Sequence, residues 1–133
     1  MTFISSAASF VGRAMLVAVF LLEGWIKING YSAAVAYMQK SFVPAELLPV
    51  AILTEVIGSV LIIVGWQTRF AALALALFSL LAAALFHSRL AVPNEALHFW
   101  KDIGLAGGFL LLVAFGPGAW SLDETISARR AVS

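Results

Sequence analysis

Four apolar stretches, each about as long as a helix that crosses a bilayer, constrain this chain more than any other feature. They run over residues 10–28, 48–66, 70–90 and 97–115. A transmembrane helix needs about 20 consecutive apolar residues, and in lipid only a helix or a closed barrel satisfies its own backbone hydrogen bonds. We therefore predict an all-α fold, an integral membrane four-helix bundle, with residues 1–133 forming one transmembrane domain.

The composition narrows the possible partners and chemistry. Hydrophobic residues make up 62% of the chain and charged residues 11%, whereas about a quarter of a soluble domain is charged. The net charge of +1 provides no basic patch, so the lipid bilayer is a predicted partner and nucleic acid is not. Because the chain contains no cysteine, disulfides, thiolate nucleophiles and iron–sulfur ligation are excluded.

Two short helices are predicted in addition to the four spans. Ser32 is a candidate N-cap for residues 33–40, which are too few to cross the bilayer and should lie at the interface or fold into the bundle mouth. Gly116-Pro117-Gly118 ends the last span. Ser121 and Glu124 then match a capping box, which predicts a short C-terminal tail helix.

Small residues suggest where the spans approach one another closely. Gly58 and Gly65 are one heptad apart in the second span, and Gly104 and Gly108 form a small-xxx-small pair in the fourth. Glycine at such positions lets a neighbouring helix pack against the backbone. We predict close helix contacts at both pairs.

The basic residues give a prediction for orientation. Each side of the membrane holds four Lys or Arg residues, but Lys27 and Lys101 are expected inside the bundle, which leaves four against two in favour of the side with the termini. Since cytoplasmic connections are enriched in basic residues, both termini are predicted to be cytoplasmic.

Ionisable residues from all four spans are predicted to meet at one end of the bundle. Consecutive spans alternate in direction, and at 1.5 Å per residue most of these side chains lie about 5–10 Å inside the same interface. Charged groups at such depth are costly and indicate function by default. We interpret the layer as a small-ligand site formed by Glu23, Lys27, Glu55, His87, Lys101 and Asp102.

Several members of this layer also admit a structural interpretation. Glu23 and Lys27 are spaced i,i+4, so they could form no more than a local ion pair. Glu55 has no base within one helical turn, so its partner must come from another helix. Lys101 and Asp102 diverge by about 100° around their helix, which predicts that they face different neighbours.

The two histidines of the chain lead to separate predictions. His87 is predicted to be the proton-responsive member of the layer, because small shifts move a histidine across neutral pH. His87, His98 and a carboxylate could in principle bind a metal, but their spacing does not match a metal motif, so no metal is predicted.

A second cluster is predicted at the opposite end of the bundle. It contains Arg13, Arg69 and Asp123. We expect Arg–carboxylate contacts that hold the tail against the bundle, which is a structural role.

In chain order these residues also match a family pattern. The pattern consists of Arg13, Phe20-x-x-x-Gly24-x-x-Lys27, Glu55-x-x-Gly58, Gly65-x-x-Thr68-Arg69, His87, Lys101-Asp102 with Gly107-Gly108, and Gly116-Pro117-Gly118-x-x-Ser121-Leu122-Asp123. With this ordered set the chain resembles the DoxX family of small four-helix bacterial membrane proteins over nearly its whole length. The resemblance implies a multi-pass protein of the inner membrane and a membrane partner of redox systems, since relatives are linked to thiosulfate:quinone oxidoreductase and quinol oxidase complexes. Asp102 stands where the family often carries asparagine.

The leading hypothesis is therefore a membrane subunit or small-ligand site of a redox system, which binds a quinone or similar lipophilic molecule without a covalent cofactor. In it, His87 and Glu55 exchange protons with the headgroup, while Lys27 or Lys101 polarises a carbonyl oxygen. A redox partner subunit or a homo-oligomer would complete the system, and whether the chain belongs to an oxidoreductase stays open. The alternative is a non-enzymatic scaffold or anchoring subunit for a partner protein, whose buried ions fix the helix register. A transporter is less favoured because the chain lacks repeat symmetry and broken helices.

Overall fold

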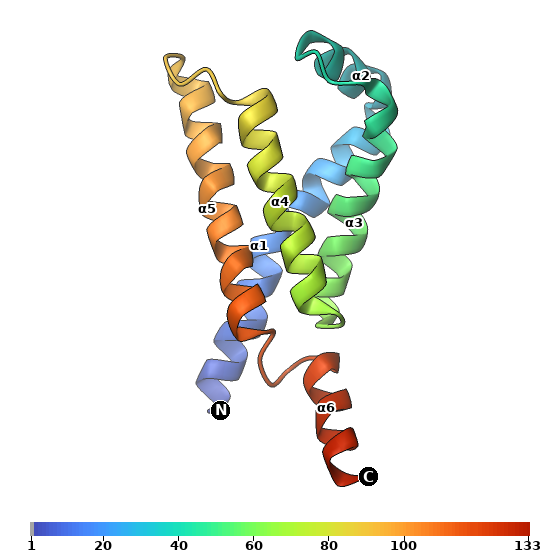
Figure 1. Cartoon of the computed structure of the whole chain (residues 1–133), viewed down its shortest axis with the longest axis vertical. Coiled ribbons are helices and arrows are strands. Elements are labelled where there is room, and N and C mark those ends of the chain that lie inside the picture. Colours follow the sequence, from blue (N-terminus) through green and yellow to red (C-terminus); the bar gives the residue numbers. More distant parts are fainter. Residues whose placement is uncertain (1) are drawn as a thin grey trace.

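Four long helices form the body of the molecule in a computed structural model that describes residues 2–133. They are α1 (Phe3–Asn29), α3 (Leu48–Val64), α4 (Thr68–Phe86) and α5 (Pro93–Phe115). All four are long and apolar enough to span a membrane, α3 together with the 3-10 turn η1 (Ala45–Leu47) that precedes it. The predicted all-α bundle with four spans is confirmed, and both termini lie at the same end of it (Figure 1).

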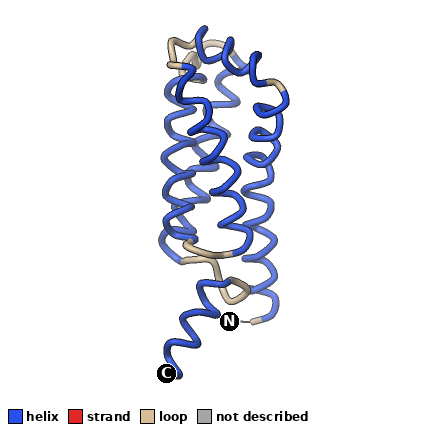
Figure 2. Tube along the Cα trace, turned by 90° about the vertical axis from the view of Figure 1, so that its right-hand side faces the viewer, coloured by secondary structure: helices blue, strands red, loops and turns tan. Residues whose placement is uncertain are grey.

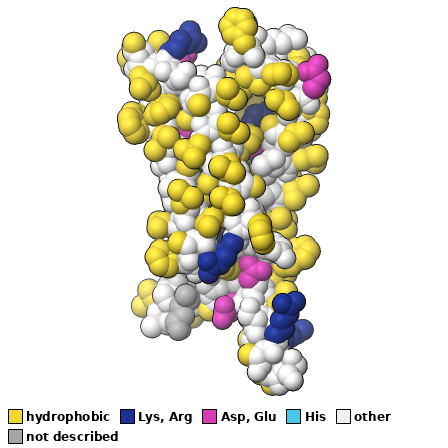
Figure 3. All heavy atoms as spheres, in the orientation of Figure 1, with side chains coloured by type: hydrophobic (Ala, Val, Ile, Leu, Met, Phe, Trp, Pro, Cys, Tyr) yellow, Lys and Arg dark blue, Asp and Glu magenta, His cyan; other side chains and the backbone are white. Residues whose placement is uncertain are grey.

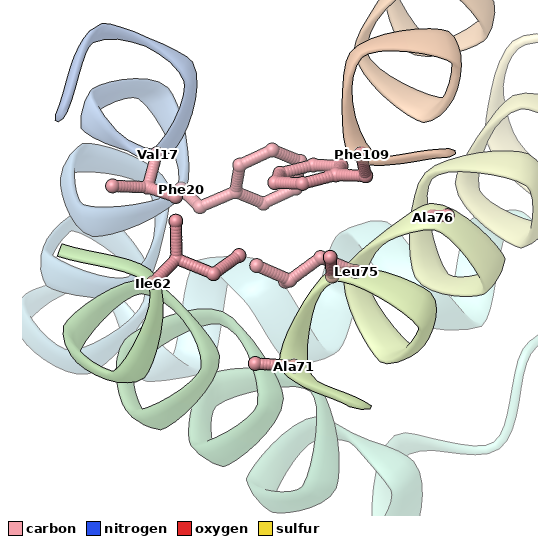
Figure 4. Packing of buried hydrophobic residues seen from close by; sticks show 8 residues of the cluster. Val17, Phe20, Ile62, Ala71, Leu75, Ala76 and Phe109 are labelled. Atoms are coloured by element: carbon pink, nitrogen blue, oxygen red, sulfur yellow. The ribbon is translucent and has the colours of Figure 1, made fainter. Parts of the chain in front are cut away.

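The long helices pack side by side along the long axis of the molecule, with the connections at its two ends (Figure 2). Helix α3 packs against α1 and α4, and α4 packs against α5. Val17, Phe20, Ile62, Leu75 and Phe109 bring all four helices together in the core (Figure 4). Hydrophobic side chains also cover much of the outer surface (Figure 3), as expected for helices that face lipid.

Two short helices complete the fold, as predicted. Helix α2 (Tyr31–Lys40) folds onto the end of the bundle, where Met38 packs in a small apolar cluster against Phe86 of α4. Its N-cap is Gly30 without a side-chain hydrogen bond, so the prediction of Ser32 as the cap is wrong. Helix α6 (Leu122–Val132) begins at its predicted N-cap, Ser121, whose hydroxyl accepts a hydrogen bond from the Glu124 backbone N–H at 3.2 Å.

The largest differences from the predicted spans are the earlier starts of α1 and α5 and the earlier end of α4. Helix α1 starts at Phe3 because the Thr2 side chain caps it, accepting a 3.1 Å hydrogen bond from a backbone N–H in the first turn. Helix α5 starts at Pro93, since proline is favoured at the first helical position. Helix α4 ends at Phe86, which leaves His87 as its C-cap.

The glycines have different roles from one another. Gly58 and Gly108 allow close packing, because a Cβ would lie 3.2 Å from Leu75 at the first and 3.0 Å from α1 at the second. Gly104 has no neighbour within 4 Å, so the prediction of a packed glycine pair is only half right. Gly65 ends α3 in the left-handed conformation, with φ of 76°.

Candidate functional site

A small polar cavity lies near the end of the bundle that carries α2. Its volume is about 160 Å³, and a cavity of about 150 Å³ is known to admit a benzene ring. Helices α1, α2, α4 and α5 contribute residues to its wall, and so does His87, the C-cap of α4. The lining residues are Phe20, Glu23, Lys27, Tyr37, Phe78, Ser79, Ala82, His87, Lys101 and Asp102. The structure thus brings together all the residues of the predicted layer except Glu55.

Glu55 lies outside the cavity wall. Its side chain is completely buried on α3, where it accepts a hydrogen bond from the Lys27 ammonium of α1. The prediction that its partner comes from another helix is confirmed. The two helices approach closely here because α1 carries Gly24, where a Cβ would lie only 2.7 Å from the Val56 side chain. Glu55 therefore positions Lys27 from behind and does not line the cavity.

Glu23 connects two lysines across the cavity. Its Oε2 lies 3.8 Å from Lys27 Nζ, and its Oε1 lies 3.5 Å from Lys101 Nζ on α5. Lys101 Nζ also lies 3.7 Å from Oδ1 of the adjacent Asp102. As predicted, the two residues face different neighbours, since Lys101 lies beside Glu23 of α1 and Asp102 lies beside His87 at the end of α4. Both nevertheless line the cavity.

His87 and Asp102 form the other side of the cavity. His87 Nε2 lies 3.9 Å from Asp102 Oδ2, which is too far for a direct hydrogen bond. The ring of His87 stacks on that of His98, with 5.1 Å between the centroids. Within residues 2–133 no group of three His, Cys, Asp or Glu side chains could hold a metal ion.

Tyr37 reaches the cavity from α2 and is not among the residues predicted for the layer. Its ring stacks on Phe86 with 5.3 Å between the centroids. Burial raises the pKa of the Tyr37 phenol, so at neutral pH it remains a neutral hydrogen-bond donor. Its place could not be read from helical spacing, because it depends on how α2 folds back onto the bundle.

The titration of His87 tests the electrostatics of this end of the bundle. His87 lies just beyond α4, and burial lowers its pKa, which the charge of Asp102 partly raises again and those of His98 and Lys101 lower. We expect ¹⁵N NMR of labelled histidine to place its midpoint below the ordinary histidine value. Since a lowered pKa favours the neutral form in the folded state, the associated stability is present at neutral pH and is lost as the pH falls.

The substitution Asp102→Asn should lower the midpoint of His87 further, because the opposing negative charge is removed. His98, the other histidine of the chain, provides an internal comparison in the same spectra. A His87 midpoint that rises in this variant would contradict the prediction.

At the opposite end of the bundle, Arg13 makes contacts of a different kind from those predicted. It is 2% exposed, and its guanidinium donates to the carbonyl oxygens of Ile62 at 2.7 Å, Ile63 at 3.1 Å and Trp120. Two of these carbonyls belong to the last turn of α3, where the orphan carbonyls of a helix favour a cation. Arg13 thus links the end of α3 to the loop before α6.

Arg69 and Asp123 cap two further helices. Arg69 Nη1 donates to the carbonyl oxygens of Val113 at 2.6 Å and Ala114 at 2.9 Å, in the last turn of α5. The two Asp123 oxygens accept hydrogen bonds from the backbone N–H groups of Gln67 and Thr68 at 2.9 Å, where α4 begins. The predicted Arg–carboxylate contacts are therefore wrong: among residues 2–133, neither Arg13 nor Arg69 has a carboxylate within 4.0 Å, and the cluster acts through helix ends.

Comparisons with known proteins agree with the fold. Residues 8–88 match the family model described as DoxX. The chain is 42% identical over 119 residues to the inner membrane protein YqjF of Escherichia coli strain K12, covering 90% of this chain and 92% of that protein. It is 33% identical over 121 residues to the inner membrane protein YphA of the same strain, covering 86% of each chain. No solved structure matches.

Proposed function

The chain belongs to the DoxX family and is a multi-pass protein of the inner membrane, and on this premise we propose that its polar cavity binds the ring headgroup of a quinone or a similar lipophilic redox molecule. The observation that carries this proposal is the convergence of five ionisable side chains on one ring-sized cavity. They are Glu23, Lys27, His87, Lys101 and Asp102. The DoxX resemblance supplies the redox context.

The cavity offers both of the surfaces that such a headgroup needs. Phe20 and Phe78 provide apolar walls for a ring, with their own ring centroids 6.2 Å apart. The ammonium groups of Lys27 and Lys101 are placed to donate hydrogen bonds to a carbonyl oxygen. His87, with Asp102 beside it, can take up or release the proton that accompanies reduction or oxidation. Without cysteine in the chain, electrons would come from or pass to a partner subunit.

The rival function is a scaffold in which the same ions hold the helices together. The observation in its favour is that the ion pairs join helices in turn: Lys27 and Glu55 connect α1 with α3, and Glu23 and Lys101 connect α1 with α5. A buried ion pair can specify a helix arrangement without binding any ligand. The cavity between these pairs favours ligand binding over the scaffold function, because a scaffold does not need a cavity.

Binding of a short-chain ubiquinone to detergent-purified protein tests the proposal. We expect measurable binding by calorimetry and about a tenfold weaker affinity for Lys101→Met, because a hydrogen bond from a charged donor to the ligand is lost. The matched control is Arg89→Met. Arg89 lies near the same end, and its side chain is 77% exposed in a surface pair with Glu95, so its loss should leave the affinity unchanged. Absence of binding to the folded wild type would favour the scaffold.

A further inference from the structure

Beyond the proposed quinone site, we propose a second ligand site at the other end of the bundle, for the phosphodiester headgroup of an anionic phospholipid. A cavity of about 510 Å³ lies there between the start of α4, the end of α5 and α6. Two arginines and three uncharged polar residues are part of its lining, namely Gln67, Thr68, Arg69, Ser127 and Arg130. These are donor groups that recognise phosphate oxygens.

The guanidinium groups of this cavity keep donors for a ligand. Arg69 uses Nη1 to cap α5, but its Nε and Nη2 donate no hydrogen bond to any residue from 2 to 133. The Arg130 side chain likewise forms neither a hydrogen bond nor an ion pair in the described part of the chain. A phosphate can accept from both groups in the bidentate manner that arginine favours.

Two acidic residues also line the cavity, but neither Arg69 nor Arg130 forms an ion pair with any carboxylate among residues 2–133. Both oxygens of Asp123 are committed to the backbone N–H groups at the start of α4. Glu124 also lines the cavity and opposes an anion there. Thr68 is also part of the lining, and its hydroxyl is fully buried and has no hydrogen-bond partner among residues 2–133. A ligand that accepts hydrogen bonds would satisfy groups that the protein leaves unpaired.

The surroundings favour a lipid headgroup over a soluble phosphate. Trp66, Phe70 and Phe115 line the same cavity and are 48%, 75% and 80% exposed. Aromatic rings of this kind mark the depth of the membrane interface, where basic pockets at the ends of transmembrane helices bind anionic headgroups. Figure 3 shows charged side chains of both signs gathered at this end, below a surface of hydrophobic side chains.

Native mass spectrometry of the intact chain in detergent, titrated with phosphatidylglycerol and with phosphatidylcholine, tests this site. We expect preferential binding of phosphatidylglycerol, and about a fivefold weaker affinity for Arg130→Gln, the effect of one basic group near a lipid surface. The matched control is Arg129→Gln, since Arg129 is the adjacent arginine and does not line this cavity. Glu124→Gln should strengthen binding, because it removes the opposing charge.

Three results would overturn the proposal. Equal losses for Arg129→Gln and Arg130→Gln would indicate diffuse surface charge instead of a site. Equal affinity for phosphatidylcholine would show that the net negative charge of the lipid is not recognised. Displacement of phosphatidylglycerol by millimolar inorganic phosphate would identify a soluble phosphate site. None of these results depends on the quinone cavity at the other end.

Discussion

The substitution Glu55→Leu is expected to lower the free energy of unfolding by about 3 kcal/mol, the lower end of the range for breaking a buried ion pair. Glu55 is completely buried, and its loss leaves the Lys27 ammonium without its nearest partner. Glu23, whose Oε2 lies 3.8 Å from Lys27 Nζ, compensates only in part. Reversible unfolding in mixed detergent micelles measures the change.

The double variant Glu55→Leu with Lys27→Met separates structure from function. Replacing a whole buried ion pair by apolar side chains is often neutral or stabilising, so stability should return to near the wild-type level. Because Lys27 lines the cavity, quinone binding should not return with it. A double variant as unstable as Glu55→Leu would contradict our account of the pair, and one that binds quinone normally would remove Lys27 from the site.

The depth of each candidate site residue was predictable from the sequence, whereas the direction in which its side chain points was not. Spans of known rise and alternating direction place Glu23, Glu55 and His87 near one interface whatever the details of packing. Whether a side chain lines a cavity depends on the rotation of each helix and on side-chain flexibility. For that reason the sequence did not reveal that Glu55 lies behind Lys27, or that Lys101 and Asp102 both line the cavity.

The helix ends were harder to predict than the spans for a related reason. An apolar run marks the part of a helix that lipid surrounds, but α1 begins earlier, at Phe3, where the polar side chain of Thr2 caps it. At the end of the bundle opposite the polar cavity, the sequence indicated that Arg13 and Asp123 form a cluster, but their hydrogen-bond partners are backbone groups. Side-chain patterns carry no direct signal for backbone carbonyls, so an arginine near a carboxylate suggested the wrong partner.

A further prediction concerns Gly65, which ends α3 at the same end of the bundle as Arg13 and Asp123. We expect Gly65→Ala to lower the free energy of unfolding by about 2–5 kcal/mol, the sum of the cost of a left-handed alanine and of overpacking. Gly65 has φ of 76°. A Cβ there would lie 2.4 Å from Ser121 Cβ and 2.8 Å from Arg13 Nη1, so the alanine would also push the arginine away from the carbonyls that it caps.

The matched control is Gly104→Ala, at a glycine inside α5 with no neighbour within 4 Å of a Cβ. Because alanine is favoured over glycine in a helix interior by up to about 1 kcal/mol, this variant should be as stable as the wild type or more so. Both variants can be compared by thermal unfolding in the same detergent. Equal stability of the two would show that the loop before α6 can move away from the end of α3, and that the contacts of Arg13 do not fix it there.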